Sequence, residues 1–381
     1  MKIAIIGSGI AGLFSGLIIK NNLKNVDLVV FEKNNKIGGR IKMDNFEGQE
    51  VISGAGIGRK DDELLYELCK YLNVTVNEYH AEFEHTSEPI DIVKILSYLK
   101  ENFHNLTRDK ENFKEFATKI LGKEIYDKFT FSVGETDYEK ADVLDTIFDY
   151  GFKNYTSSGF DAFSIKWTEL LKSFEKKLKG NNIKLNQNIK KISIQSDGKI
   201  KVNNELFDKI ILATPVNVIR KLLPDFKLFK YIEGQPFVRL FVKLDKPLNN
   251  VSKSFIKTNK PFQKIIVIDK KKCIYQISYS DNKFANRWMS VENIPKVVEN
   301  GIMKIFKQKV KVLKHKLVYW ENGTHYFKPL PKEFRNRDEF LDLCQNPYKN
   351  VFCVGEALSR NQGWCEGALE SVLKIISKIL L

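Results

Sequence analysis

The feature that most constrains the fold is a glycine-rich turn at the start of the chain. Residues 3–6 form a short apolar run rich in β-branched side chains, and Gly7, Gly9 and Gly12 follow it with the spacing G-x-G-x-x-G. Residues 13–20 then have the apolar pattern of a helix. The sequence therefore predicts a strand, a tight turn and a helix.

Each part of this unit suits a dinucleotide. Gly7 allows the turn, Gly9 lets a pyrophosphate approach the backbone, and Gly12 lets the helix pack closely on the strand. Ile10 and Ala11 lie at the helix N-terminus, where free amides favour phosphate. We therefore predict that these five residues bind a dinucleotide.

A second strand supports this prediction over a plain turn or a signal-peptide core. Residues 27–31 are again apolar and end on Glu32, about twenty residues after Gly12, where the fingerprint places an acid on the ribose hydroxyls. Lys33, which comes next, is assigned to the same site. The spacing predicts that Glu32 binds the ribose.

A Gly-Gly-Arg loop points to one class of dinucleotide. Residues 36–40 are KIGGR, and flavoproteins related to the amine oxidases carry such a loop beside the FAD pyrophosphate. The N-terminal segment thus resembles the flavin-containing monoamine and polyamine oxidase family, which includes protoporphyrinogen oxidase-like proteins. The resemblance implies that FAD is the cofactor and that Gly39 and Arg40 contact it.

The end of the chain carries a second resemblance to the same family. Residues 351–356 (VFCVGE) are typical of a strand, and residues 363–371 (GWCEGALES) open the last helix, as in the family's GE…G-aromatic-x-E-G-A signature. The helix N-terminus suits the flavin edge on which negative charge develops. The resemblance implies flavin contacts from Gly355, Glu356, Gly363, Trp364, Cys365 and Ala368. Trp364 matches an aromatic that walls the substrate, and packing at the helix start is the alternative.

Three internal segments have weaker counterparts in the family. Residues 48–59 form a glycine-rich turn that, by resemblance, places Gly56 and Ile57 on the flavin, although the usual Asp near Ile52 is absent. A plain turn before a helix is the alternative. Residues 207–215 predict a buried strand and resemble the segment that returns to the FAD domain, and a strand near Ile189 is expected at the adenine end.

The substrate side departs from the family at Arg239. Many amine oxidases place a lysine, bridged by water to flavin N5, on a strand that ends in Pro, and counting back from Pro247 puts Arg239 there. Arginine holds its proton and presents a planar fork of donors, which suits a carboxylate. Arg239 is therefore either a structural donor near N5, a residue that favours an acidic substrate such as an amino acid, or a surface strand residue. Some relatives attach flavin through a cysteine in the segment that matches residues 320–329. Only His325 and Tyr326 are available here, so we expect non-covalent FAD.

Composition excludes several other classes of protein. The formal net charge is +15, but the lysines are spread along the chain and no nucleic-acid motif is present, so a polyanion partner is the less favoured interpretation. Five cysteines without CxxC pairs and five histidines without ligand spacing predict neither a disulfide framework nor a metal site. No apolar run has the length of a membrane span. We expect an intracellular, cytoplasmic protein.

These patterns predict a two-domain α/β flavoprotein. A Rossmann-like FAD domain is expected from residues 1–75, 182–216 and 340–381, and an α+β substrate domain from residues 76–181 and 217–339. The leading function is an FAD-dependent oxidase of an amine or amino acid that passes hydride to flavin N5 and electrons to O2. A desaturase or protoporphyrinogen oxidase-like enzyme and a flavin-binding protein without turnover are the alternatives.

Overall fold

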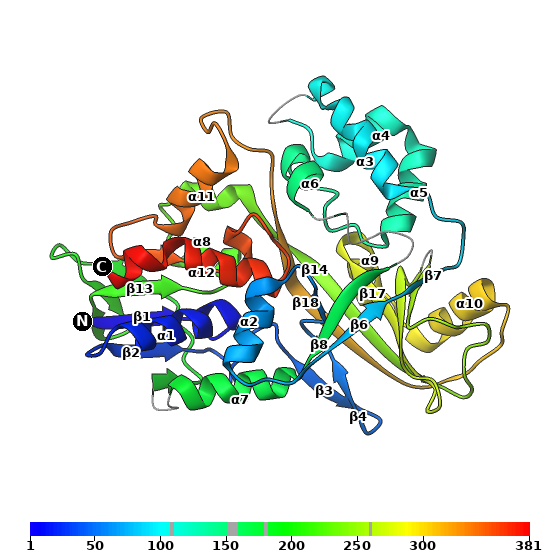
Figure 1. Ribbon diagram of the computed structural model, residues 1–381, viewed down its shortest axis with the longest axis horizontal. Helices are drawn as coiled ribbons and strands as arrows, with labels where there is room; N and C mark the ends of the chain where they lie inside the picture. The colour runs from blue at the N-terminus through cyan, green and yellow to red at the C-terminus, as the bar shows by residue number, and fades with distance from the viewer. Residues whose placement is uncertain (107–109, 151, 153–158, 179–181, 259–260) are drawn as a thin grey trace.

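The computed structural model describes residues 1–106, 110–150, 152, 159–178, 182–258 and 261–381. Both termini lie in one lobe, drawn at the left of Figure 1, and a second lobe holds the long strands and a group of helices. The chain passes between the lobes several times. This arrangement confirms the predicted two-part α/β fold.

A parallel five-stranded sheet forms the centre of the first lobe. The strand order is β19-β13-β1-β2-β9, and every neighbouring pair is parallel. Strands that are distant in sequence therefore meet in one sheet, as in a doubly wound fold. Their bounds are β1 (Lys2–Ile6), β2 (Asp27–Phe31), β9 (Ile183–Lys184), β13 (Lys209–Leu212) and β19 (Val351–Cys353).

Successive side chains of β1 point to opposite faces of this sheet and enter two different hydrophobic cores. Ile3 and Ile5 pack with α1, α2, α7 and α12, whereas Ala4 and Ile6 pack with a small sheet, α8 and α11. The strand is therefore buried on both sides, which explains its uninterrupted apolar sequence. The covering elements are α1 (Ile10–Asn22), α2 (Glu63–Tyr71), α7 (Trp167–Leu178), α12 (Cys365–Leu380), α8 (Val216–Leu222), α11 (Arg337–Gln345), β10 (Ile192–Ile194), β11 (Ile200–Val202) and β12 (Glu205–Phe207).

A six-stranded sheet organises the second lobe, in the order β18-β14-β17-β16-β15-β7. One face carries Val238, Leu240 and Val242, which pack against α9 and α10. The elements are β7 (Phe83–His85), β14 (Ile232–Leu244), β15 (Phe255–Lys257), β16 (Lys264–Asp269), β17 (Ile274–Asp281), β18 (Val312–Phe327), α9 (Asn282–Met289) and α10 (Ile294–Phe306). Because side chains alternate along β14, Phe237 and Arg239 occupy the opposite face.

A helical group caps the second lobe with an aromatic core of its own. In Figure 1 it lies above the sheet, at the upper right. It comprises α3 (Ile92–Glu101), α4 (Phe113–Leu121), α5 (Lys123–Val133) and α6 (Val143–Asp149). Short strands link the two lobes: β3 (Met43–Phe46), β4 (Gln49–Ile52), β5 (Gly58–Arg59), β6 (Val76–Ala81) and β8 (Phe160–Ile165).

Several local predictions differ from the observed elements. The single strand expected over 207–215 is divided between β12 and β13, and Ile189 lies in the loop between β9 and β10 instead of a strand. Helix α7, expected with the substrate domain, packs its apolar face into the core around α1. We therefore propose a domain division that assigns α7 to the first lobe.

Candidate functional site

The glycine turn is held tightly between β1 and α1. A Cβ on Gly7 would lie 2.4 Å from the Ala213 carbonyl oxygen, and one on Gly12 would lie 2.1 Å from the Gly7 carbonyl oxygen. Gly7 also has a φ of +106°, which favours glycine. Gly9 differs, because a Cβ there would meet no atom within 4 Å. The turn is therefore closed at two glycines and open at Gly9, beside the buried Ile10 and Ala11.

Glu32 lies at the carboxyl end of β2, next to this turn. Its Oε2 accepts hydrogen bonds from the Ser8 amide at 3.0 Å and the Ser8 hydroxyl at 2.6 Å. Its Oε1 accepts from the amide and side chain of Asn34 at 2.9 Å each. Glu32 is only 4% exposed, whereas the neighbouring Lys33 is exposed to solvent. The acid is thus fixed beside the turn, and the lysine points outward.

The Gly-Gly-Arg loop packs directly on the glycine turn. The Gly38 amide donates to the Ser8 carbonyl at 2.9 Å, and a Cβ on Gly39 would lie 3.1 Å from the Gly9 Cα. The Arg40 carbonyl in turn accepts a hydrogen bond from the Ala55 amide at 2.8 Å. The loop of residues 53–57, which we call the bridging loop, is therefore tied to the dinucleotide turn through Arg40.

Glu356 joins this loop to β18 and to the start of α12. Its Oε1 lies 2.6 Å from the Arg40 guanidinium and 2.5 Å from His325 Nδ1, and its Oε2 accepts from the Gly363 amide at 2.9 Å. Burial alone would raise the pKa of this carboxyl, but His325 and Arg40 hold the pKa well below its usual range. The Val216 amide donates to His325 Nε2 at 3.4 Å, which assigns the proton to Nδ1. Both carboxylate oxygens of Glu356 are therefore occupied, and the residue links Arg40 and His325 to the loop before α12.

The bridging loop also contacts the aromatic start of α12 and the substrate sheet. The Trp167 indole donates to the Gly56 carbonyl at 2.9 Å, and its ring meets that of Trp364 edge to face at 6.3 Å. On its other side, a Cβ on Gly56 would lie 3.3 Å from an Arg239 guanidinium nitrogen. Gly56 therefore contacts Arg239 directly and is connected to Trp364 through Trp167.

Trp364 itself has a fixed orientation. Its indole N–H donates to Asp62 Oδ2 at 2.7 Å, and the same oxygen accepts from the Arg59 amide at 2.6 Å. Burial raises the pKa of Asp62 against these hydrogen bonds. Cys365 and Ala368 follow as buried residues of α12. The ring is thus held by a hydrogen bond as well as by packing.

Arg239 lies on the face of β14 opposite α9 and α10, and it is buried there with only 4% of its surface exposed. Its guanidinium lies 4.7 Å from the Tyr279 ring centre and 5.6 Å from that of Phe237, and Nη1 donates to Gln276 Oε1 at 3.0 Å. Burial lowers its pKa, and Tyr279 opposes that shift. An arginine guanidinium is not deprotonated in proteins, so the charge is retained. The alternative of a surface strand residue is wrong.

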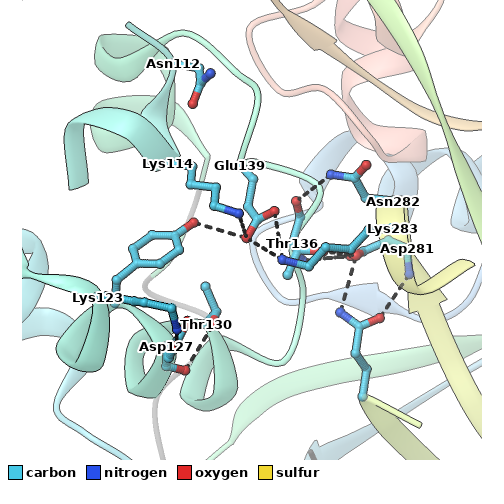
Figure 2. A network of polar contacts seen from close by, with 12 residues as sticks. Asn112, Lys114, Lys123, Asp127, Thr130, Thr136, Glu139, Asp281, Asn282 and Lys283 are labelled. Atoms are coloured by element: carbon cyan, nitrogen blue, oxygen red, sulfur yellow. Dashed lines mark hydrogen bonds and ion pairs between the residues drawn. The ribbon is translucent and has the colours of Figure 1, made fainter. Parts of the chain in front are cut away.

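Carboxylates near this face are occupied by other partners. Glu135 pairs with Lys264 at 2.5 Å, and Asp281 accepts from the Thr136 amide and hydroxyl and from the Gln263 side chain. Figure 2 shows Asp281 directed at Thr136, beside the pairing of Glu139 with Lys114 and Lys283. A cavity of about 700 Å³ lies at this junction of α4 and α9. Its lining contains none of the predicted site residues.

The chain matches a family model described as flavin-containing amine oxidoreductase over residues 10–374. It belongs to this family. Membership makes the protein an FAD-dependent oxidoreductase that acts on a small molecule, with the flavin held non-covalently, as the sequence predicted. The fold and family predictions are thereby confirmed.

Solved structures share the fold of this amine oxidoreductase at low sequence identity. A putrescine oxidase bound to putrescine is 12% identical with a TM-score of 0.79, and the match covers 100% of this chain and 99% of that one. A protoporphyrinogen oxidase-like protein from Exiguobacterium is 13% identical with a TM-score of 0.71, over 100% and 98% of the chains.

Among curated proteins, the similarity is confined to short stretches. A 15-cis-phytoene desaturase of Capsicum annuum is 31% identical over 96 residues, which are 22% of this chain and 16% of that protein. The chain spans at most 31% of the curated relatives it matches. These relatives therefore leave the substrate to be argued from the site.

The residues of this amine oxidoreductase fit FAD at several points. A Cβ on Gly9 or Gly355 would enter open space, so the backbone is accessible at both positions. The buried Thr214 hydroxyl, just after β13, has no partner. These groups lie where β1, β13 and β19 end, the edge at which parallel sheets bind ligands. Among the described residues, no helix has the length and apolarity to cross a bilayer.

Some predicted residues lie apart from this site, and others had not been identified. Tyr326 pairs across the strands with Glu233 and follows His325 on β18, so the two side chains take opposite faces. Gln276, Tyr279 and Trp167 were not predicted as site residues. Alternation along β17 could have placed Tyr279 and Arg239 on one face only with the strand pairing known, and that pairing includes a register shift after Leu240.

Proposed function

We propose that this protein is an FAD-dependent oxidase of an amine or amino acid. The substrate would lose a hydride from the carbon that bears nitrogen and a proton from the nitrogen, and would leave as an imine that water hydrolyses. FAD supplies the two-electron acceptor, and O2 then takes those electrons with two protons to give H2O2. The electrons and protons of the proposed reaction therefore balance.

The observation that carries this proposal is the pair of buried polar side chains, Arg239 and Gln276, next to Gly56. Arg239 and Gln276 are buried there, beside a loop tied to the dinucleotide turn. A polar substrate has acceptors for their N–H groups, whereas a hydrocarbon would leave these donors unsatisfied at a cost of about 1–3 kcal/mol each. The short match to a phytoene desaturase keeps C–C oxidation as the second candidate.

The site residues have separate proposed roles. Glu32 would bind the ribose, and the N-terminus of α1 would bind the pyrophosphate. Arg40, His325 and Glu356 would hold the flavin-facing loops in place, because Glu356 forms an ion pair with Arg40 and a hydrogen bond with His325. Trp364 would form an aromatic wall of the substrate site and exclude water from it.

The test begins with the absorbance spectrum of the purified protein. We expect flavin bands that bleach when the protein is mixed anaerobically with one class of amine or amino acid, and H2O2 on admission of air. Bleaching by a polyene or porphyrinogen alone would favour the second candidate. Bound flavin that none of these compounds reduces would favour a protein without turnover, and a folded protein that binds no FAD would contradict the proposal.

A further inference from the structure

Arg239 is a buried cation that lacks an anionic partner. It is not within ion-pair distance of any carboxylate among the residues that the structure describes, and its Nε has no acceptor. Its protein contacts are the Gln276 amide oxygen and two aromatic rings. Burying an uncompensated charge is costly, so the arrangement calls for an anion from outside the chain.

Several other sheltered cations of this protein have carboxylate partners. Arg40 lies 2.6 Å from Glu356, and Lys264, on the strand beyond β17, lies 2.5 Å from Glu135. Arg337 lies 2.7 Å from Asp145 with its side chain 1% exposed. Lys209, which is 9% exposed, instead donates to the Ile379 carbonyl at 2.8 Å. Arg239 differs from the first three because no carboxylate among the described residues lies within ion-pair distance of it, and from Lys209 because one of its charged nitrogens has no acceptor there.

A second unsatisfied donor lies beside the first. Gln276 is 2% exposed, and its Nε2 has no partner within the described part of the chain, while its Oε1 accepts from Arg239. The site thus offers a guanidinium N–H and an amide N–H without acceptors. A carboxylate, which only accepts hydrogen bonds and has about four acceptor positions, matches this pair of donors.

The position of these donors connects them with the reaction. Arg239 lies against Gly56, and the Gly56 carbonyl holds Trp167, which packs on Trp364 at the start of α12. We propose that Arg239 and Gln276 bind the carboxylate of the substrate, so that the substrate is an amino acid and not a simple amine. This inference rests on the proposed oxidation at a carbon that bears nitrogen.

The experiment compares substrates that differ only in the carboxylate. The FAD-loaded protein is mixed anaerobically with ornithine and putrescine, lysine and cadaverine, and phenylalanine and phenethylamine, and flavin bleaching is followed against concentration. We expect an amino acid to be preferred over its decarboxylated partner. Arg239→Met is expected to raise the KM for the amino acid roughly 30-fold or more, since removal of a buried charge partner costs at least about 2 kcal/mol. It should leave the KM for the amine little changed, and Arg239→Lys should restore part of the loss.

A binding measurement provides a readout apart from turnover. Unreactive carboxylates, namely propionate and 3-phenylpropionate, should raise the thermal midpoint of the loaded wild type and not that of Arg239→Met. The matched control is Lys264→Met, which removes a buried cation that already has a carboxylate partner. This variant should keep the preference for the amino acid over the amine.

The outcomes separate this inference from the proposed function. If Arg239→Met loses FAD while its remaining loaded fraction keeps the wild-type preference, the anion belongs to the cofactor and the inference is wrong. Equal preference for amines and amino acids in the wild type would also overturn it. If no amine or amino acid bleaches the flavin, the proposed function fails, and the binding of 3-phenylpropionate then decides the role of Arg239 alone.

Discussion

Arg40 and Arg239 both lie beside the bridging loop, but their surroundings differ. The side chain of Arg40 is 33% exposed and has a carboxylate at 2.6 Å, whereas the more deeply buried Arg239 has no carboxylate partner among the residues that the structure describes. Desolvation alone predicts the reverse, because water can solvate an exposed charge. We propose that the cofactor side completes its own ion pair, while the substrate side leaves one charge for a ligand.

The largest expected effect tests the completed side. Glu356→Ala leaves His325 and Arg40 without their shared carboxylate, and we expect it to destabilise the protein by about 3–5 kcal/mol, the usual cost of breaking a buried ion pair. Thermal unfolding of the variant checks this. Glu124→Ala is the control, because that side chain is 84% exposed and should change stability by no more than about 0.5 kcal/mol. Equal shifts in the two variants would show that Glu356 is not an anchor.

The next prediction compares the two arginines without substrate. Arg40→Met should lower the thermal midpoint, since it removes the ion pair with Glu356 and the hydrogen bond to the Gly323 carbonyl. Arg239→Met combined with Gln276→Leu should be neutral or stabilising by up to about 4 kcal/mol, because it replaces an uncompensated buried charge by apolar side chains. The measurement is thermal unfolding of FAD-loaded protein. Marked destabilisation of the double variant would mean that Arg239 is compensated within the fold.

The same comparison applies to two buried carboxylates near α12. Glu366 accepts hydrogen bonds from the Leu64 and Leu65 amides at 2.8 Å each. Its burial raises the pKa to about 7 against those hydrogen bonds. Glu356, by contrast, has a lowered pKa because of its cations. A carboxyl with a raised pKa binds its proton more tightly in the folded state. Its contribution to stability is therefore full below the unfolded pKa of about 4.3 and is lost as the pH rises to about 7.

This sign gives a pH prediction of moderate size. Between pH 5 and pH 7, the thermal midpoint of the wild type should fall relative to that of Glu366→Gln, which does not titrate there. The contribution of Glu356 has the opposite sign and is lost only as the pH falls below about 4. Parallel midpoints across pH 5 to 7 would contradict a raised pKa at Glu366.

The local sequence predicted the individual motifs of this site better than the contacts between them. The helix and the two strands predicted around the glycine turn are observed as α1, β1 and β2, and both strands lie in the parallel sheet. Apolar periodicity shows that α7 has a buried face, but it does not identify the surface that the face covers. That is why the sequence grouped α7 with the substrate domain, although its apolar face packs in the core around α1.

The environment of Arg239 depends on pairing between distant strands. Gln276 and Tyr279 come from β17, and the register shift between Leu240 and Phe241 changes which side chains face one another. The hydrogen bond of His325 with Glu356 likewise joins β18 to the loop after β19. Motifs within one segment were therefore predictable, whereas contacts set by register were not.

The smallest expected change in stability comes from Gly9→Ala. In the glycine turn a Cβ would enter open space at Gly9, whereas at Gly7 and Gly12 it would meet backbone atoms. Gly9 has a φ of −68°, which alanine adopts readily, and its Cβ would meet no atom within 4 Å. Gly9→Ala should therefore change the stability of the FAD-free protein by no more than about 0.5 kcal/mol. It should nevertheless weaken FAD binding in a fluorescence titration, because the open space is where the backbone admits a pyrophosphate.

Gly12→Ala is the matched control. Its Cβ would lie 2.1 Å from the Gly7 carbonyl oxygen, so we expect this variant to disrupt folding with or without FAD. If Gly9→Ala binds FAD as tightly as the wild type, the cofactor does not approach this glycine, and the completed side of the comparison would have to be placed elsewhere along the sheet edge.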